Sequence, residues 1–212
     1  MNQTEQVLAV ETKLVEEIGL FQGLMFDVEP YLNKLFAPGV ARFLPRPDAE
    51  KNPDFKQLIP YVIICHDQKV LSYVRGKRAG EKRLTGLRSI GIGGHINPVD
   101  VNTNLFNTDF YETVYQPAVE REIEEEIAID AQHTDRIVAL LNDDSNEVGS
   151  VHLGVVHLWN LDKPHVEKRE QMITQLTFMT PAELETVRDT CETWSQKCLD
   201  HLEKIIQTTQ LK

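Results

Sequence analysis

One short segment rich in glutamate constrains the fold of this chain more than any other. Residues 121–129 read Arg-Glu-Ile-Glu-Glu-Glu-Ile-Ala-Ile, within a stretch that predicts a helix over residues 113–129. At about 100° per residue, one narrow face of this helix carries three carboxylates, and the neighbouring face carries apolar side chains. The carboxylates are those of Glu122, Glu125 and Glu126, and the apolar side chains are those of Val119, Ile123 and Ile127. We therefore expect the apolar stripe to pack on a sheet and Glu120 and Glu124 to face solvent.

The three carboxylates raise a question of stability, because like charges on one helical face repel one another. A hard divalent cation such as Mg²⁺ relieves that repulsion, since it binds oxygen ligands and bridges protein carboxylates to substrate phosphates. The helix alone leaves two interpretations open. One is a metal site, and the other is a solvated, glutamate-rich surface.

The rest of the chain predicts an α/β protein with a mixed sheet between helices. Apolar, β-branched runs predict strands over residues 6–11, 58–66, 69–74, 136–141, 150–161 and 171–179. Helices are expected over residues 12–18, from Glu29 to Pro38 and after Thr180, and loops over residues 43–52 and 97–109. No linker divides the chain, so we expect a domain over residues 58–212, ending in a C-terminal helix, with an N-terminal extension over residues 1–57 packed on it.

Two capping boxes are expected to open helices. Thr113 and Gln116 match the pattern before the glutamate-rich helix, which places Pro117 in the first turn. Thr180 and Glu183 match it before the C-terminal helical region. The apolar stripe of that region is expected to be core packing, and it consists of Leu184, Val187, Cys191, Trp194, Cys198, Leu202 and Ile205.

Composition excludes several classes of protein. The 212 residues include 33 acidic and 22 basic side chains, and the formal charge of −11 argues against binding a nucleic-acid polymer. Apolar runs such as residues 61–65 are too short to span a membrane, and residues 1–6 lack the features of a secretory signal. The three cysteines form no obvious disulfide framework, which favours a reducing cytoplasm.

The glutamate-rich helix resembles the second half of the Nudix box, the signature of the Nudix (MutT-like) hydrolases. The family pattern is G-x5-E-x7-R-E-U-x-E-E-x-G-U, where U is a bulky apolar residue. The residues that match it position by position are Arg121, Glu122, Ile123, Glu125, Glu126 and Ile129. A Gly-rich segment, Gly91-Ile-Gly-Gly-His95, precedes the helix, as a Gly-Gly pair does in the family. The resemblance covers about residues 58–179, and it is closest to poorly characterised members described only as predicted phosphoesterases.

This resemblance implies a Nudix-like α/β/α sandwich and a hydrolase that acts on phosphoric anhydrides. Its implied cofactor is Mg²⁺ or Mn²⁺, bound by Glu122, Glu125, Glu126 and the carbonyl of Gly94. Arg121 precedes Glu125 by four residues and is expected to hold its carboxylate by a charge-assisted hydrogen bond. The implied reaction is hydrolysis of a diphosphate bond, in a nucleoside diphosphate linked to another moiety or in a similar small phosphorylated metabolite.

The chain departs from the family pattern at three places. Arg121 follows Gly94 by 27 residues, 13 more than in the pattern, so an insertion separates the two halves of the box. Thr113 stands where the pattern has a glutamate, and Ala128 stands where it has a glycine. These departures leave an alternative open, in which the fold is retained as a ligand-binding module with weak catalysis or none.

A basic segment is the first candidate for substrate binding. Residues 75–88 contain six basic side chains and one acidic side chain, a local charge of +5. We expect phosphate contacts from Arg75, Arg83, Arg88, Gly93 and His95, and the alternative for the basic segment is a solvated loop. The expected partner is a small phosphorylated substrate, such as a nucleotide, and the possibility of a homo-oligomer is left open.

Histidines and loop acids provide weaker candidates. His152 and His157 are five apart on one predicted strand, so they face opposite sides and are expected to be core or surface residues. Relatives sometimes recruit a further acid from outside the box as a metal ligand or general base. In this sequence the candidates for such an acid are Glu147 and Glu170.

Overall fold

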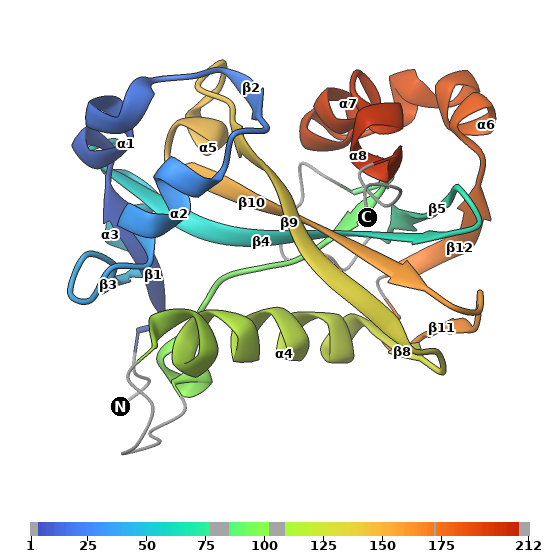
Figure 1. Cartoon of the computed structure of the whole chain (residues 1–212), viewed down its shortest axis with the longest axis horizontal. Coiled ribbons are helices and arrows are strands. Elements are labelled where there is room, and N and C mark those ends of the chain that lie inside the picture. Colours follow the sequence, from blue (N-terminus) through green and yellow to red (C-terminus); the bar gives the residue numbers. More distant parts are fainter. Residues whose placement is uncertain (1–3, 77–84, 102–108, 172, 208–212) are drawn as a thin grey trace. The chain divides into compact units, whose positions relative to one another are not determined.

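The computed structural model describes residues 4–76, 85–101, 109–171 and 173–207 (Figure 1). Arg83, one of the predicted substrate contacts, lies outside these residues. The chain forms two compact units, each assembled from segments that are far apart in the sequence. Unit 1 comprises Met1–Pro60, Gly93–Arg121 and Ala139–Val155, and unit 2 comprises Tyr61–Ile92, Glu122–Val138 and Val156–Lys212. An N-terminal extension over residues 1–57, packed on a domain over residues 58–212, stays a prediction.

Unit 1 is organised around its first strand. Its elements are β1 (Gln6–Glu11), α1 (Thr12–Gly19), β2 (Gly23–Met25), α2 (Glu29–Leu35), β3 (Arg42–Pro45), α3 (Arg46–Ala49) and α5 (Glu147–Ser150), with a 3-10 turn at Pro98–Asp100 and a π turn at Tyr111–Tyr115. β1 pairs antiparallel with β3 on one side and with the beginning of β4 (Phe55–His66) on the other. The helices α1 and α2 contact each other, and α1 also contacts β1 (Figure 1).

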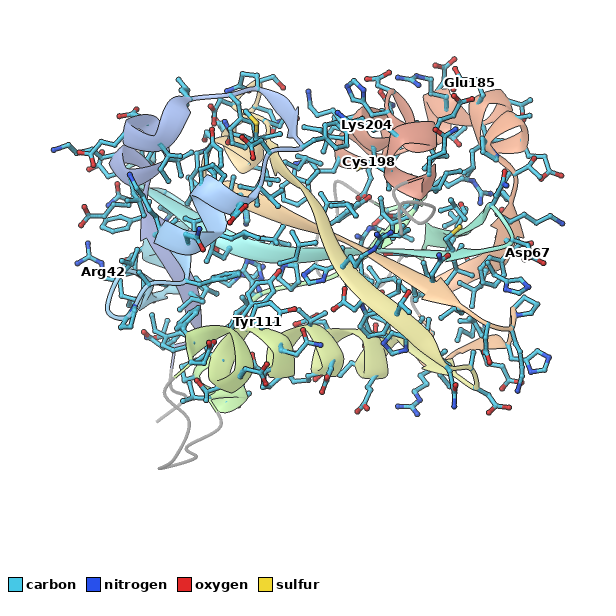
Figure 2. The ribbon with its side chains drawn as sticks, viewed as in Figure 1. Arg42, Asp67, Tyr111, Glu185, Cys198 and Lys204 are labelled. Carbon is cyan, nitrogen blue, oxygen red and sulfur yellow. The ribbon has the colours of Figure 1, made fainter. Side chains whose placement is uncertain are left out.

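Unit 2 contains a hairpin and the C-terminal helices. Its elements are β5 (Lys69–Arg75), β6 (Arg88–Ser89), β7 (Gly91–Ile92), β8 (Ile127–Ile129), β11 (Val166–Lys168), β12 (Ile173–Met179), α6 (Pro181–Thr186), α7 (Thr193–Leu199) and α8 (Leu202–Gln207). In the hairpin, Asp67 and Gln68 have φ angles of 47° and 62°, the left-handed pair that a tight two-residue turn needs. The strands predicted over residues 58–66 and 69–74 therefore pair as a hairpin, and Asp67 lies at its tip (Figure 2).

The main sheet is mixed. Hydrogen bonds join its strands in the order β12-β5-β4-β10-β9-β2, where β9 is His133–Asn142 and β10 is His152–Leu161. The pairs β12–β5, β4–β5 and β2–β9 are antiparallel. Beside them, the N–H of Gln57 donates to the carbonyl of Val151 at 2.8 Å, and the ring of His66 lies 3.0 Å from the carbonyl of Leu161. From Gln57 to His66 on β4, the neighbouring residue advances from Val151 to Leu161, so β4 and β10 run parallel. A mixed sheet with helices confirms the predicted α/β class.

The capping box predicted for the C-terminal helical region is confirmed, but the region is divided into α6, α7 and α8 and is not a single helix. The hydroxyl of Thr180 accepts from the N–H of Glu183 at 3.2 Å, and the Glu183 carboxylate accepts from the N–H of Thr180 at 2.8 Å, which completes the capping box. Most of the predicted stripe is fully buried, namely Leu184, Cys191, Cys198, Leu202 and Ile205. Cys198 lies within this region of helices, with Lys204 on α8 (Figure 2).

The loop predicted over residues 43–52 is wrong. Its beginning belongs to β3, and Arg46–Ala49 forms the short helix α3. Pro45 and Pro47 suggested a loop, but both occupy positions that tolerate proline. Pro45 ends a strand that pairs only with β1 within the described residues, and Pro47 lies in the first turn of α3. Within the described ranges, no helix has both the length and the hydropathy of a membrane span.

Candidate active site

The glutamate-rich helix begins earlier than its sequence predicts. The carboxylate of Asp109 accepts from the N–H groups of Tyr111 and Glu112 at 2.8 and 3.3 Å, so Asp109 caps the helix in place of Thr113. The hydroxyl of Thr113 donates to the carbonyl of Asp109 instead. The prediction of a capping box at Thr113 is therefore wrong, because Asp109, four residues earlier, accepts from the first free N–H groups of the helix.

Proline shapes the first part of this helix. Tyr111–Tyr115 is a π turn that leads into α4 (Gln116–Glu126), and the N–H of Gln116 donates to the carbonyl of Tyr111, five residues back. Pro117 has no N–H and its ring would crowd the carbonyl four residues earlier, which accounts for the wider turn. The ring centroid of Phe36 lies 5.6 Å from that of Tyr111 and 4.8 Å from that of Tyr115, and this aromatic cluster anchors the beginning of the helix. Tyr111 is labelled at that end of the helix in Figure 2.

The end of α4 also differs from the prediction. The helix ends at Glu126, and Ile127–Ile129 forms β8, which pairs antiparallel with β11. The carbonyl of Glu126 accepts from the N–H groups of Arg169 and Glu170 at 2.9 and 3.2 Å, and the guanidinium of Arg169 donates to the carbonyl of Glu124 at 2.8 Å. These bonds satisfy the last carbonyls of the helix, so Ala128 continues as a strand without a left-handed residue.

The faces of α4 are arranged as predicted. Val119, Ile123 and Ile127 are at most 2% exposed, which confirms the apolar stripe. Glu120 and Glu124 are exposed, as expected. Of the three glutamates that match the Nudix box, Glu122 and Glu126 are partly buried and Glu125 is exposed.

In unit 1, Arg121 forms a bidentate ion pair with Asp100. Its Nε and Nη2 donate to the two carboxylate oxygens at 2.6 and 2.9 Å, and Nη2 also donates to the carbonyl of His95 at 3.0 Å. Asp100 is buried and accepts the N–H of Asn97 at 2.7 Å. Arg121 therefore holds the segment that follows the two glycines. Sequence reasoning missed Asp100, although Asn97-Pro-Val-Asp100 has a helix-capping pattern. The expected contact of Arg121 with Glu125 stays a prediction.

His95 follows Gly93 and Gly94 in unit 1. Its Nε2 is buried without a hydrogen-bond partner in the described part of the chain, and its ring lies 5.7 Å from that of His152. Burial, with help from the positive charge of Arg46 and from His152, lowers the pKa of His95 to about 3. The ring is neutral at physiological pH, so any phosphate contact that it makes is a hydrogen bond without a charge. The roles of Gly93, Gly94 and His95 stay predictions.

In unit 2, Glu126 is surrounded by other charged groups. Burial raises the pKa of its carboxyl to about 7, the positive charge of Arg75 lowers it, and the carboxylates of Glu122, Glu170 and Glu192 raise it further. Glu170, a predicted additional acid, therefore lies near Glu126, whereas Glu147 is an exposed residue of α5 in unit 1. Buried Glu192 was not predicted, and no signal in the sequence distinguishes it from other acids of the C-terminal region.

The two described arginines of the basic segment have different surroundings. Arg75 lies with its guanidinium 5.6 Å from the ring of Tyr73, and its Nε is 3.4 Å from the carboxylate of Glu192. Arg88 is 9% exposed and donates to the side chains of Ser72 and Gln175 at 2.9 and 3.1 Å. Substrate binding by both stays a prediction, but the contacts of Arg88 are those of a side chain that joins strands.

The remaining histidine candidate is a core residue. His157 is fully buried, and its Nδ1 lies 2.8 Å from the carboxylate of Asp135. This position agrees with the expectation of a core or surface role.

Comparison with known proteins identifies the family. No family model matches the chain. Protein YmaB of Bacillus subtilis is 36% identical over 168 residues, which cover 76% of this chain and 78% of YmaB. The crystal structure of Tm1382, assigned to the Nudix hydrolases, has 29% identity and a TM-score of 0.76 over 94% of this chain and 99% of that one. The chain belongs to the Nudix superfamily. Within it, the chain is in the family of YmaB.

A more distant structure shows how far the fold extends. DR0079 of Deinococcus radiodurans has 11% identity and a TM-score of 0.53, over 78% of this Nudix chain and 94% of its own. At that identity the likeness concerns the fold alone. The Nudix resemblance seen in residues 121–129 is matched by the likeness of the fold to Tm1382 over 94% of this chain.

The donor atoms of this Nudix protein suit a divalent cation in their chemistry. Glu122, Glu125 and Glu126 offer hard oxygen ligands from consecutive turns of α4. The pKa of Glu126 is raised first by burial and then by the carboxylates of Glu122, Glu170 and Glu192, and a cation would neutralise that negative charge. As they stand, however, the described residues contain no group of three or more His, Cys, Asp or Glu side chains arranged to hold a metal ion.

Proposed function

We propose that this protein is a Nudix-type hydrolase that uses Mg²⁺ or Mn²⁺ to cleave a diphosphate bond. The proposed substrate is a nucleoside diphosphate linked to another moiety, or a similar small phosphorylated metabolite. The observation that carries this proposal is the concentration of carboxylates around Glu126 on a helix with the Arg-Glu-Ile-x-Glu-Glu pattern. Membership of the Nudix superfamily supports the reaction class.

The proposed metal ligands are Glu122, Glu125 and Glu126, with the carbonyl of Gly94 as the resemblance implies. A divalent cation bound there would neutralise diphosphate oxygens and lower the pKa of a water molecule. Arg121 would act indirectly, since its bonds to Asp100 and to the carbonyl of His95 hold the segment that follows Gly94.

The chain's own residues supply the remaining parts of the reaction. Arg75 would bind a phosphate oxygen, because its guanidinium lies near Glu126 and is fixed by Glu192. Glu126 or Glu170 would accept the proton of the attacking water, since the two lie close together and the pKa of Glu126 is near neutrality. His95 would contact the substrate as a neutral group.

The proposed substrate is a small molecule and not a nucleic-acid polymer, because the chain carries a formal charge of −11. We propose the cytoplasm as its location, on the basis of the free cysteines. The loops around the site would select the group attached to the diphosphate.

A second candidate function is a ligand-binding module with the Nudix fold. It is favoured by one observation, namely that the described carboxylates are not arranged as a metal site. Such a module would bind nucleotides with little dependence on metal and would not turn them over.

A substrate panel tests the proposal. Release of phosphate or nucleoside monophosphate is measured from dinucleotides, nucleoside diphosphate sugars and nucleoside triphosphates, with Mg²⁺ and with a chelator. We expect hydrolysis of at least one diphosphate class, its loss with the chelator, and its loss in Glu125→Gln and Glu126→Gln. Hydrolysis that persists in both variants would contradict the proposed mechanism, and binding without hydrolysis would support the second candidate.

A further inference from the structure

A buried carboxylate of the C-terminal helical region lies beside Arg75 in unit 2. Glu192 immediately precedes α7 and is 5% exposed. Its Oε2 lies 3.4 Å from the Nε of Arg75. Burial of a carboxylate costs free energy unless the charge is paired and hydrogen-bonded. The contacts of Glu192 therefore indicate its role.

The other oxygen of Glu192 is surrounded by hydroxyl groups. The hydroxyls of Ser89, Tyr61 and Ser195 lie 2.6, 3.2 and 3.3 Å from Oε1. The backbone N–H of Glu192 donates to the carbonyl of Arg88 at 2.9 Å, which ties the residue to β6. Both the backbone and one carboxylate oxygen are thus fixed, so the second oxygen faces the guanidinium in a defined position.

The first glycine of the Gly-rich segment makes this arrangement possible. A Cβ atom at position 91 would lie 2.2 Å from ring atoms of Tyr61. Only glycine lets this ring pass beneath β7, where its hydroxyl reaches Glu192. Gly91 therefore serves the network around Glu192, a role separate from that expected for Gly93 and Gly94.

Arg75 has a charge partner but lacks a full set of hydrogen bonds. A guanidinium carries five N–H donors. Its Nε is buried and has no hydrogen-bond partner among the residues that the structure describes. The ion pair with Glu192 and the face of Tyr73 hold the charge in place, and Glu126 lies near enough to interact electrostatically with it. Such a group is suited to bind an anion that reaches α4.

We propose that Glu192 is a positioning residue, which holds the guanidinium of Arg75 near the carboxylate of Glu126 on α4 so that Arg75 binds a phosphate group of the substrate. The inference rests on the proposed function and deepens it, because it gives the C-terminal helical region a part in substrate binding. Charged hydrogen bonds to phosphate depend on geometry, so a displaced guanidinium binds more weakly than a fixed one.

A double-mutant cycle tests this proposal. The probe is methylene diphosphonate, a diphosphate mimic that is not hydrolysed, titrated calorimetrically at a fixed Mg²⁺ concentration. The variants are Arg75→Gln, Glu192→Gln and the double variant. We expect each single substitution to weaken binding roughly tenfold, and the double variant to bind no more weakly than Arg75→Gln, because both remove the same interaction.

Folding is checked in the same series. If Glu192→Gln does not fold, Tyr61→Phe replaces it, since this variant removes one supporting hydroxyl and keeps the charge. It is expected to weaken binding by about two- to fivefold, and to have no effect in the Arg75→Gln background. The matched control is Glu185→Gln, an exposed acid of the same region that pairs with Arg188, and it should bind as the unmodified protein does.

Several results would overturn the proposal. They are unchanged binding in Glu192→Gln or its substitute, effects that multiply in the double variant, and failure of the unmodified protein to bind the probe. A different result would contradict only the proposed function. In that case the cycle is non-additive as expected, but no diphosphate is hydrolysed.

Discussion

Arg75 and Arg88 lie on neighbouring strands of unit 2, and the sequence alone assigned both to the substrate. β5 and β6 pair so that Arg88 is opposite Val74, next to Arg75 in the chain. Arg88 donates to two side chains within the unit, whereas Arg75 is held by the charge of Glu192 and has a buried Nε without a hydrogen bond in the described residues. The positive charge of an arginine alone therefore does not indicate its function. A guanidinium bonded to protein acceptors stabilises the fold, and one held by charge retains the capacity to bind an anion.

The largest expected effect concerns the carboxylate near Arg75. Glu126→Gln should reduce kcat by roughly 10²- to 10⁴-fold, because an amide neither binds a cation strongly nor accepts a proton. The measurement is steady-state hydrolysis of the best substrate from the panel. Glu124→Gln, on the exposed face of the same helix, is the control and should keep its activity within about twofold. Equal losses of kcat in the two variants would show that the carboxylate near Arg75 contributes no more to the reaction than the exposed carboxylate of Glu124.

Replacement of each arginine by glutamine tests whether Arg75 binds substrate and Arg88 stabilises the fold. Arg75→Gln should raise KM by roughly 10- to 100-fold with a small change in stability, because it removes a charged donor to phosphate. Arg88→Gln should lower the free energy of unfolding by about 1–3 kcal/mol and leave KM within about twofold, because it leaves buried Ser72 without its donor. Urea unfolding and steady-state kinetics measure the two quantities. If Arg88→Gln raises KM and Arg75→Gln lowers only stability, the assignment of the two side chains is reversed.

A smaller effect is expected in the dependence of stability on pH. The pKa of Glu126 is raised to about 7 in the folded chain, so the folded state binds more protons than the unfolded state between about pH 4.5 and 7. The contribution of Glu126 to stability is therefore complete below pH 4.5, and it is lost as the pH rises to 7, by about 1–3 kcal/mol in the absence of metal. Urea unfolding of the unmodified protein and of Glu126→Gln, with chelator, measures the difference. Parallel curves across this range would show that the carboxyl is not perturbed.

Features that depend on neighbours in the sequence could be predicted. The apolar stripe of α4, the turn at Asp67 and Gln68 and the cap at Thr180 all follow from periodicity or turn chemistry within a few residues. The beginning of α4 could not be predicted, because Asp109 and Thr113 both offer a cap and the wider turn before Pro117 decides between them.

Partners that are distant in the sequence could not be predicted from it. Asp100 pairs with Arg121 across 21 residues, and Glu192 lies beside Arg75 across more than a hundred. Nothing in the local pattern distinguishes Glu192 from exposed acids such as Glu185, because its burial arises from strands β4 and β6 that pack against the C-terminal region. The candidate site was therefore found from its helix, and the groups that support it were found from the structure.

The proposed hydrolysis of a diphosphate requires that the carboxylates of α4 bind a divalent cation. Calorimetric titration of the protein with Mn²⁺ alone tests it most directly, with Glu122→Gln, Glu126→Gln and the control Glu124→Gln measured in parallel. We expect a saturable site in the unmodified protein and in Glu124→Gln, and its loss in the other two variants. The same binding in all four proteins, or no saturable binding in any, would contradict it.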